Sequence, residues 1–492
     1  MSEHADRGVD RGSRRSPQRR ARVRLACLLL GLAGCAVGPD FTRPAPPTVS
    51  AYLPPEPSPT PSPQGGTEAV QRVALGERIP AQWWGLFHSA RLDEFLRQAI
   101  VASYTLAAAR ATLAQAREAI IEARAGLYPQ VDLGANAHRG TSATGGVANL
   151  FSVGPTVSYS IDAFGGTRRH VEQEAALAEN QWYQLAAAYL TLTGNSVVEA
   201  ITAASTRLQI ATVEDLIRND QKNLDLTERE FNAGKVARAD VLTAAAQLET
   251  DRTQLPALRQ QLSAASHALT LLAARAPSSW SPPEFDIDEF TLPGKLPMSL
   301  PSELVHERPD ILAAEALVHA DSAAIGVATA QMYPSITLSA SFMQAAPSAS
   351  SLFNSVSQLW GIGAALDAPL YSGGALTAQR RAAIDTFDAG LATYQQTVLQ
   401  AFAQVADALT ALEHDSEMVA ASRRAVDIAH ASLKLQRSSY VAGKTSALQL
   451  IVAENTYSNA RLGYARADGQ RLTDTAQLFI AVGGGWWDSG DI

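Results

Sequence analysis

Two short stretches hold residue types that could bind a nucleotide or a metal, but neither has the spacing this chemistry needs. Gly443-Lys444-Thr445 looks like the end of a phosphate-binding loop, yet Ser438 occupies a position where that motif requires glycine. In His306-Glu307-Arg308-Pro309, the proline prevents the helical i, i+4 histidine pair that binds zinc. The other histidines are scattered, and the sequence has no Gly-x-Ser-x-Gly nucleophile elbow. We therefore predict no enzyme activity, no metal and no cofactor.

One cysteine near the N-terminus is placed for covalent lipid attachment. Residues 1–24 are rich in arginine, and the apolar run that follows, 25–34, is too short to span a membrane. This pattern is typical of a bacterial export signal. The run ends Leu32-Ala33-Gly34-Cys35, which is similar to the lipobox of bacterial lipoproteins, in which cleavage before the cysteine leaves it acylated. We predict a signal peptide over 1–34 and a lipid on Cys35; the alternative is a free cysteine after an ordinary signal.

Charge argues against one class of partner. The formal net charge is −8, and the first 34 residues carry eight arginines against three acids, so the rest of the chain is more acidic still. A protein that binds nucleic acid needs a basic surface to neutralise phosphates. We therefore predict no nucleic-acid partner.

The stretch from 333 to 366 contains no charged residue and alternates twice between apolar and small or polar residues. The same pattern occurs earlier, over 130–138 and 151–162. A period of two places each set on one face of a strand, and about ten residues suffice for a tilted strand to cross a bilayer. An ordinary half-buried hairpin is the alternative, but the repetition favours membrane strands. Four strands cannot close a barrel, so several chains must combine theirs.

Long helical segments surround these strands, and proline-rich segments flank the helices. We expect one helix of about 38 residues ending near Leu127, one of roughly 65 residues ending before Gly234, and a third from 239 to 275 with a kink at Pro256. The proline-rich tether would space the lipid from the body. The predicted divisions are a signal peptide at 1–34, an anchor and tether at 35–80, a first repeat at 81–275 with strands at 128–162, a linker at 276–301, a second repeat at 302–485 with strands at 333–368, and a tail at 486–492.

The second half of the chain repeats the first. Tyr128-Pro129 recurs as Tyr333-Pro334, an offset of 205 residues, and Gly234-Lys235 recurs as Gly443-Lys444, an offset of 209 residues. In the long helix of the second repeat, apolar residues recur with a mean step of 3.5 residues, which is typical of a coiled-coil seam. The seam residues are Ile384, Phe387, Leu391, Tyr394, Val398, Phe402, Val405, Leu409 and Leu412.

Several motifs together carry a resemblance to a known family. The chain resembles an outer-membrane efflux protein of the TolC-like superfamily, within the lipid-anchored branch of OprM and NodT type. The similarity covers about residues 35 to 485. The motifs are Glu307-Arg308-Pro309-Asp310-Ile311, Ala314-Glu315, Ala324-Ile325-Gly326, Tyr333-Pro334, Tyr371-Ser372-Gly373-Gly374, Phe231-Asn232-Ala233-Gly234, Tyr440-Val441-Ala442-Gly443 and the segment from Cys35 to Phe41.

This resemblance implies a homotrimer in the outer membrane of a Gram-negative bacterium. Three chains would form a 12-stranded β-barrel from four strands each, continued by a long α-helical coiled-coil barrel across the periplasm. It further implies a periplasmic adaptor that contacts the helical tips, and an inner-membrane pump of the resistance-nodulation-division class. The tips would lie at Gly234, Lys235, Gly443 and Lys444. The chain itself would be a passive duct for drugs or other small solutes.

The resemblance also implies residues that close the tips. Asp240 and Tyr440 match the positions of a latch, and we hypothesise that they hydrogen-bond in the closed state; the alternative is that Asp240 merely caps a helix. Where the family has an acidic ring, this chain has Gln449 and Val452, so any cation binding would shift to Asp240 and Glu454.

Two other functions stay open at this point. A protein-secretion duct could have the same fold, although the lipobox favours drug efflux. A periplasmic coiled-coil scaffold without a pore would leave the four two-faced strands unexplained.

Overall fold

The structure is a computed structural model that describes residues 36–45, 49, 51–53, 71–141 and 146–486. The described residues form two compact units. Unit 1 contains residues 36–43, 116–178 and 317–391, and unit 2 contains the remainder. Each unit takes segments from both sequence repeats, so the compact units do not coincide with the two halves of the sequence. Four helices have residues in both units: α3 Tyr104–Ala125, α4 Gly166–Asn232, α8 Pro309–Ala330 and α9 Ala375–Val441.

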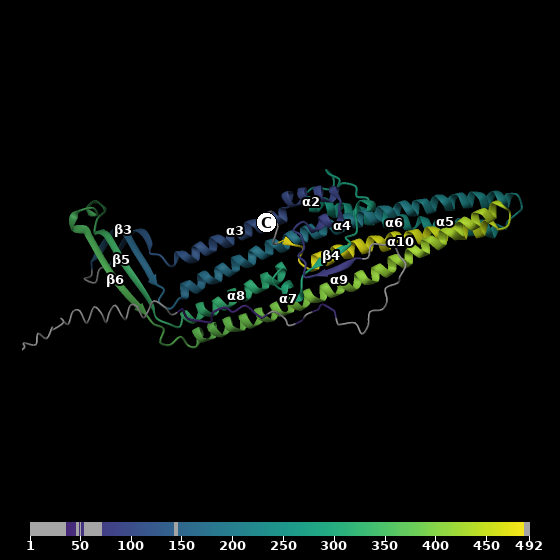
Figure 1. Cartoon of the computed structure of the whole chain (residues 1–492). Coiled ribbons are helices and arrows are strands. Elements are labelled where there is room, and N and C mark those ends of the chain that lie inside the picture. The colour runs from purple at the N-terminus through teal and green to yellow at the C-terminus, as the bar shows by residue number, and fades with distance from the viewer. Residues whose placement is uncertain (1–35, 46–48, 50, 54–70, 142–145, 487–492) are drawn as a thin grey trace, which may run out of the picture. The chain divides into compact units, whose positions relative to one another are not determined.

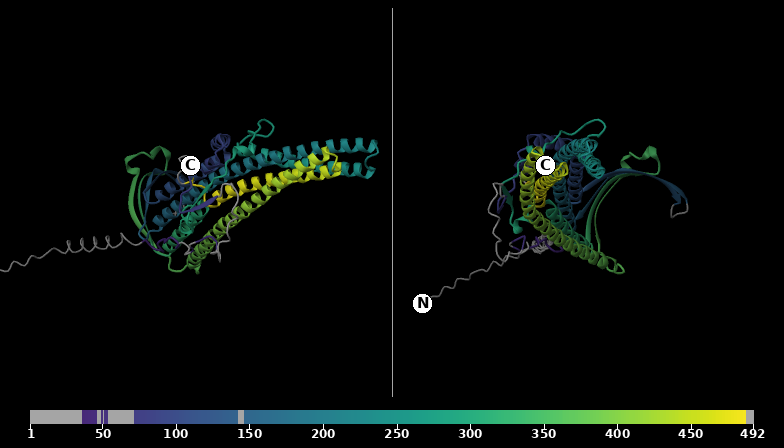
Figure 2. Two further views of the ribbon diagram at one scale, coloured as in Figure 1. Left: turned by 45° about the vertical axis from the view of Figure 1, so that its right-hand side comes forward. Right: turned by 90° about the vertical axis from the view of Figure 1, so that its right-hand side faces the viewer.

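Unit 1 contains a curved antiparallel sheet of four strands in the order β2-β3-β5-β6 (Figures 1 and 2). The strands are β2 Gln130–Thr141, β3 Val147–Ile161, β5 Ser335–Ala346 and β6 Gln358–Asp367, and short 3-10 turns η3 Ala349–Ser351 and η4 Ser355–Ser357 connect the last two. All four strands are thus where the alternating pattern predicted them. The central β3–β5 pair joins the two sequence repeats.

The register of this sheet places like residues side by side. One row across all four strands is apolar, made of Val131, Val157, Ala340 and Ile362. The adjacent row, on the other face, contains Gln130, Ser158, Ser339 and Gly363. Because side chains alternate between faces, the sheet has one apolar and one small, polar face. Ile362 is 81% exposed, so the apolar face of the sheet is uncovered there within this chain.

Unit 2 consists mainly of two helical hairpins. The first pairs α4 Gly166–Asn232 with α5 Arg238–Arg252 and α6 Gln254–Leu272; the second pairs α9 Ala375–Val441 with α10 Ala447–Ala481. α4 is 67 residues long, close to the roughly 65 residues predicted, and α9 has the same length. The two hairpins turn at the same end of the unit (Figure 1, right). Four residues of the predicted seam in α9 are buried: Tyr394, Val398, Val405 and Leu412.

Away from the hairpin turns, an aromatic core closes unit 2. Trp83 and Phe87 from η1 Trp83–Phe87 are fully buried against Phe479 of α10, with ring centroids 5.6 and 6.4 Å from it. Helix α2 Ala90–Ala102 packs Leu92, Phe95 and Leu96 into the same interior. Burial of each of these large side chains contributes on the order of 2 kcal/mol.

Two predicted helices are each divided in the structure. The predicted helix ending near Leu127 is α2 and α3 Tyr104–Ala125, because Ser103 is extended and its hydroxyl accepts the Leu106 N–H at 3.3 Å as a new N-cap. The return helix of the first repeat is interrupted at Thr253, before α6, and is not merely kinked at Pro256. The proline lacks the N–H that would bond to Arg252, so the two helices are separate.

The predicted tether and linker are partly ordered as well. Strand β1 Arg72–Leu75, from the tether, pairs in parallel with β4 Lys295–Met298, from the linker. A short 3-10 turn, η2 Ile287–Glu289, and helix α7 Pro301–Leu304 lie on either side of β4.

Helix α8 Pro309–Ala330 follows α7 and is the one described helix with the length and hydropathy of a membrane span, but 61% of that window is buried within the protein. This burial is what a core helix shows.

Candidate functional site at the turns of the helical hairpins

The two hairpin turns have the same backbone geometry. Gly234 and Gly443 have φ angles of +71° and +67°, a left-handed conformation that glycine adopts without a steric cost. The N–H of Lys235 donates to the Glu230 carbonyl at 2.9 Å, and that of Lys444 donates to the Ser439 carbonyl at 2.8 Å. These are Schellman-type helix ends. The turns predicted from the repeated Ala-Gly-Lys sequence are therefore confirmed, and all four tip residues are exposed.

Different side chains begin the two return helices. In α5, the Asp240 carboxylate accepts the N–H of Ala237 at 2.9 Å. In α10, Ser446 and Gln449 form a reciprocal capping box: the Ser446 hydroxyl accepts the Gln449 N–H at 3.3 Å, and the Gln449 side chain accepts the Ser446 N–H at 3.4 Å. Asp240 and Gln449 thus hold equivalent places in the two repeats. Each one stabilises the start of a helix.

Tyr440 joins the two hairpins within one chain. Its hydroxyl, on α9, donates to the Glu230 carboxylate on α4 at 3.1 Å. Burial raises the pKa of the Tyr440 hydroxyl, and the Glu230 carboxylate raises it further. Tyr440 therefore stays a hydrogen-bond donor at physiological pH. In this single chain its partner is Glu230, while Asp240 bonds to its own helix; a bond between Asp240 and Tyr440 in a closed assembly stays a prediction.

The other predicted gating residues lie on α10. Val452 is 57% exposed, whereas Glu454 is only 8% exposed. The Glu454 carboxylate accepts from the Asn223 amide at 2.9 Å and from Arg437 at 3.2 Å. These contacts tie α10 to α4 and α9. The structure thus gives Glu454 a place inside the helical packing, and its predicted role at a constriction stays a prediction.

A comparison with known protein families assigns both sequence repeats to one family. The family model described as "Outer membrane efflux protein" matches residues 95–275 and 300–484, which are the two repeats. The chain belongs to the outer membrane efflux protein family. Nodulation protein T of Rhizobium leguminosarum bv. viciae is 28% identical over 471 residues, which is 94% of each protein. The pyoverdine export outer membrane protein OpmQ of Pseudomonas aeruginosa is 28% identical over 480 residues, covering 94% of this chain and 96% of OpmQ.

Solved structures show the same fold. The outer-membrane channel OprN superimposes with a TM-score of 0.82 at 26% identity, over 92% of this chain and 100% of OprN. The open state of the MtrE outer membrane channel of Neisseria gonorrhoeae gives a TM-score of 0.77 at 25% identity, over 92% and 99% of the two chains. The predicted TolC-like fold, with long helices and a small sheet domain, is confirmed. This outer membrane efflux protein is a duct in the outer membrane of a Gram-negative bacterium, and its relatives are efflux channels.

Sequence reasoning missed a buried carboxyl pair between the arms of the first hairpin. Asp220 of α4 and Asp251 of α5 are each 2% exposed. Asp251 accepts from Gln247 at 2.8 Å and from Gln254 at 2.9 Å, whereas no described group donates to either carboxyl oxygen of Asp220. Burial, then the neighbouring Asp251 carboxyl, and the charge of Glu454 raise the pKa of Asp220 from 3.8 to about 8. Asp220 is therefore mainly protonated at neutral pH.

A second carboxyl pair lies between the arms of the second hairpin. Burial and the neighbouring Asp474 of α10 raise the pKa of Asp415 of α9 from 3.8 to about 7, although Arg471 and His414 oppose the rise. Nothing in the sequence singles out either pair, because charged or polar residues stand beside Asp220, Asp251 and Asp415. The sequence also does not show which helix faces each aspartate.

Proposed function

We propose that three copies of this efflux protein form the exit duct of a tripartite efflux system, combining their strands into one 12-stranded barrel. The observation that carries this proposal is the sheet itself. Its apolar row runs across all four strands and is uncovered, and β2 and β6 are edge strands within the chain. An open sheet edge cannot exist in lipid, so the edges of one copy must pair with those of its neighbours.

The proposed partners are a periplasmic adaptor and an inner-membrane pump of the resistance-nodulation-division class. The two hairpin turns support the adaptor contact, because they lie at the same end of unit 2 and expose the Gly-Lys pairs. The cargo would be small solutes. Relatives carry names for pyoverdine export, cation efflux and antibiotic efflux, so closely similar chains serve chemically different cargoes. In this proposal the pump supplies the energy and selects the cargo.

A lipid on Cys35 would give the duct a second attachment to the outer membrane. Cys35 lies outside the described residues, and the support is the export signal with its lipobox-like end. In this proposal the chain needs no other covalent group and no cofactor.

The proposed gate lies at the hairpin turns. Asp240 and Tyr440 would pair in the closed assembly, in exchange for the bonds they make in the single chain. Gln449, Val452 and Glu454 follow on the return helix α10 and would set the charge of the constriction.

A pair of adjacent substitutions tests the barrel. Leu338 and Ser339 are neighbours on β5, on the apolar and the polar face respectively. Leu338→Lys should prevent insertion, because a lysine facing lipid near the bilayer centre costs about 2–4 kcal/mol, whereas Ser339→Lys should be tolerated in a water-filled lumen. We expect the wild type and Ser339→Lys to restore drug resistance to a deletion strain and to conduct ions in planar bilayers, and Leu338→Lys to do neither.

Three results would contradict the proposal. Equal tolerance of both lysines would show that neither face of the sheet meets lipid. A delipidated wild-type protein that is a water-soluble monomer without conductance would support a scaffold without a pore. Normal conductance together with unchanged drug susceptibility and loss of a secreted protein would support the protein-secretion duct instead.

A further inference from the structure

Three glycines allow the segment just after Cys35 to sit in a narrow socket of unit 1: Gly38 belongs to the segment, and Gly165 and Gly326 belong to the socket. Gly38 has φ +97°, and a Cβ there would lie 2.4 Å from the Gly326 Cα. A Cβ on Gly326 would lie 2.7 Å from the Arg169 side chain, and one on Gly165 would lie 2.7 Å from the Ala36 Cα. Such separations are too short for real atoms. The socket therefore depends on hydrogen at each of these positions.

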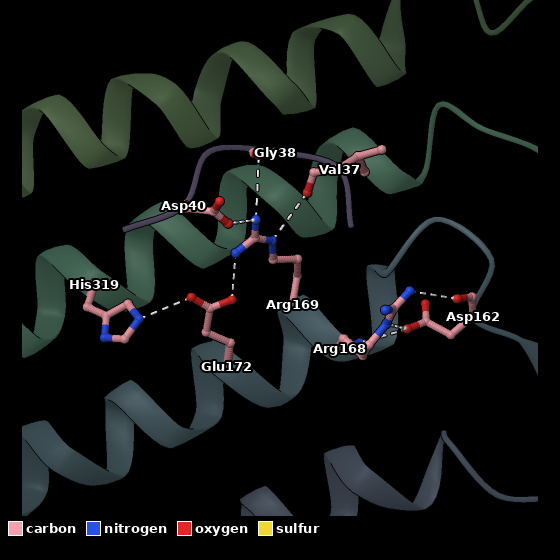
Figure 3. A network of polar contacts seen from close by, with 8 residues as sticks. All are labelled: Val37, Gly38, Asp40, Asp162, Arg168, Arg169, Glu172 and His319. Atoms are coloured by element: carbon pink, nitrogen blue, oxygen red, sulfur yellow. Dashed lines mark hydrogen bonds and ion pairs between the residues drawn. The ribbon is translucent and has the colours of Figure 1, made fainter. Parts of the chain in front are cut away.

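The side chain of Arg169 closes this socket from α4 (Figure 3). Its Nε donates to the Val37 carbonyl at 3.2 Å, and its two other nitrogens bond to Asp40 at 2.6 Å and Glu172 at 2.7 Å. The side chain is only 6% exposed. Burial alone would lower the pKa of Arg169, but the hydrogen bonds to both carboxylates raise it. The buried, permanently charged guanidinium of Arg169 thus bonds both to the backbone of the segment and to the carboxylate of Asp40.

Further contacts fix both ends of the seated segment. The Val37 N–H donates at 3.0 Å to the carbonyl of Phe164, which lies in the turn between β3 and α4. At the other end, the Phe41 ring stacks on His319 of α8 with centroids 4.4 Å apart, and His319 bonds to Glu172 at 3.1 Å. The segment therefore contacts the turn between β3 and α4, the start of α4 and the middle of α8. The residues between Cys35 and the predicted proline-rich tether are thus packed against the helices of unit 1.

We propose that this socket is a docking site for residues 36–41 and that the docked segment fixes the membrane anchor of the chain at the junction between β3 and α4. The proposal rests on the proposed lipid at Cys35, which is one residue before the socket. An acyl group at that position would enter the bilayer beside the strands of its own chain. The lipid would then hold the sheet end of unit 1 at the membrane.

The contacts are not expected to contribute equally. The Asp40 side chain is 93% exposed, so its ion pair is screened by water and should contribute little. Gly165, Gly326 and the Arg169 side chain, which donates to the Val37 carbonyl, are by contrast buried. Gly38→Ala and Arg169→Gln should therefore release the segment, and Asp40→Asn should not.

Hydrogen exchange of the full-length protein in detergent, followed by mass spectrometry of the peptide that contains Val37, tests the docking. We expect slow exchange of the Val37 amide in the wild type and at least tenfold faster exchange in Gly38→Ala and Arg169→Gln. Arg168→Gln is the matched control, because Arg168 is the next residue on α4 but bonds to Asp162 at 3.0 Å and not to the segment. It should change the Val37 rate less than twofold.

Gly38→Ala separates release of the segment from damage to the socket, because Gly38 belongs to the segment and its substitution leaves the helices that form the socket unchanged. Fast exchange in the wild type, or unchanged exchange in Gly38→Ala and Arg169→Gln, would overturn the docking while leaving the proposed duct intact. The mass of the N-terminal peptide tests the anchor separately. An unmodified Cys35 would overturn both the proposed lipid and the anchoring role, even where the Val37 amide is protected.

Discussion

The two hairpins of unit 2 have the same turn but different arms. Both turns place a glycine at a positive φ and a lysine after it. The return arm of the first hairpin, however, is broken at Thr253 and begins with a charged cap, whereas the 35 residues of α10 are unbroken and begin with a neutral one. The buried carboxyl pairs also lie at different distances from the turn. The difference indicates that the duplicated unit keeps its turn geometry while its arms have diverged.

The largest expected difference between the two hairpins is the pH dependence that their buried aspartates give to the free energy of unfolding. Because Asp220 titrates near 8 in the folded protein and near 3.8 when unfolded, the folded state binds an extra proton between these values. The free energy of unfolding should then fall as pH rises from about 4 to about 8. Asp220→Asn, which mimics the protonated acid, should remove this fall and stabilise the protein at pH 8 by about 5 kcal/mol, because each unit of pKa difference corresponds to about 1.4 kcal/mol. Thermal unfolding across this pH range measures it.

Asp415→Asn is the matched variant in the second hairpin. Its effect should be smaller and should end near pH 7, because the pKa of Asp415 is raised only to about 7 and Arg471 partly neutralises the pair. Equal pH profiles for the two variants and the wild type would show that neither Asp220 nor Asp415 has a raised pKa in the folded protein.

The glycines of the two turns should be equally sensitive to substitution. Gly234→Ala and Gly443→Ala each force a side chain into the left-handed conformation, at a cost of about 1–2 kcal/mol. A Cβ at either position would meet no atom within 4 Å, so the backbone alone sets the cost. Chemical unfolding of the two variants should give losses within about 0.5 kcal/mol of each other, which is the scale of ordinary context effects. A much larger loss at one turn would show that the turns differ in more than sequence.

The caps of α5 and α10 should differ modestly in how much stability their removal costs. Asp240→Ala should destabilise by about 1 kcal/mol and Gln449→Ala by about half as much, since a carboxylate also interacts favourably with the helix dipole. Asp240→Asn separates the hydrogen bond from the charge. The same variants in planar bilayers test the latch: if Asp240→Ala leaves conductance unchanged while Tyr440→Phe raises it, Tyr440 acts through Glu230 and not through Asp240.

The sheet was predictable from the sequence because a period of two assigns each side chain to a face without knowledge of its neighbours. The turns were predictable because only glycine suits their backbone. The partners of Tyr440, Glu454 and Asp220 were not, since each depends on how long helices align over many turns. A shift of one residue in that alignment exchanges the facing side chains. The seat of residues 36–41 also escaped prediction, because three glycines far apart in sequence give no periodic signal.

The pairing of β3 with β5 has a consequence for how this protein matures. Ser160 and Thr337 meet across these strands although 177 residues separate them in sequence. Contacts between such distant segments form slowly, and a single two-stranded hairpin is marginal in water. The first hairpin must therefore remain with its edges unpaired until the chain has been exported as far as β5, which ends at Ala346 of 492 residues. We expect this waiting intermediate to be the most aggregation-prone species in the life of the chain and the one that most needs a periplasmic chaperone.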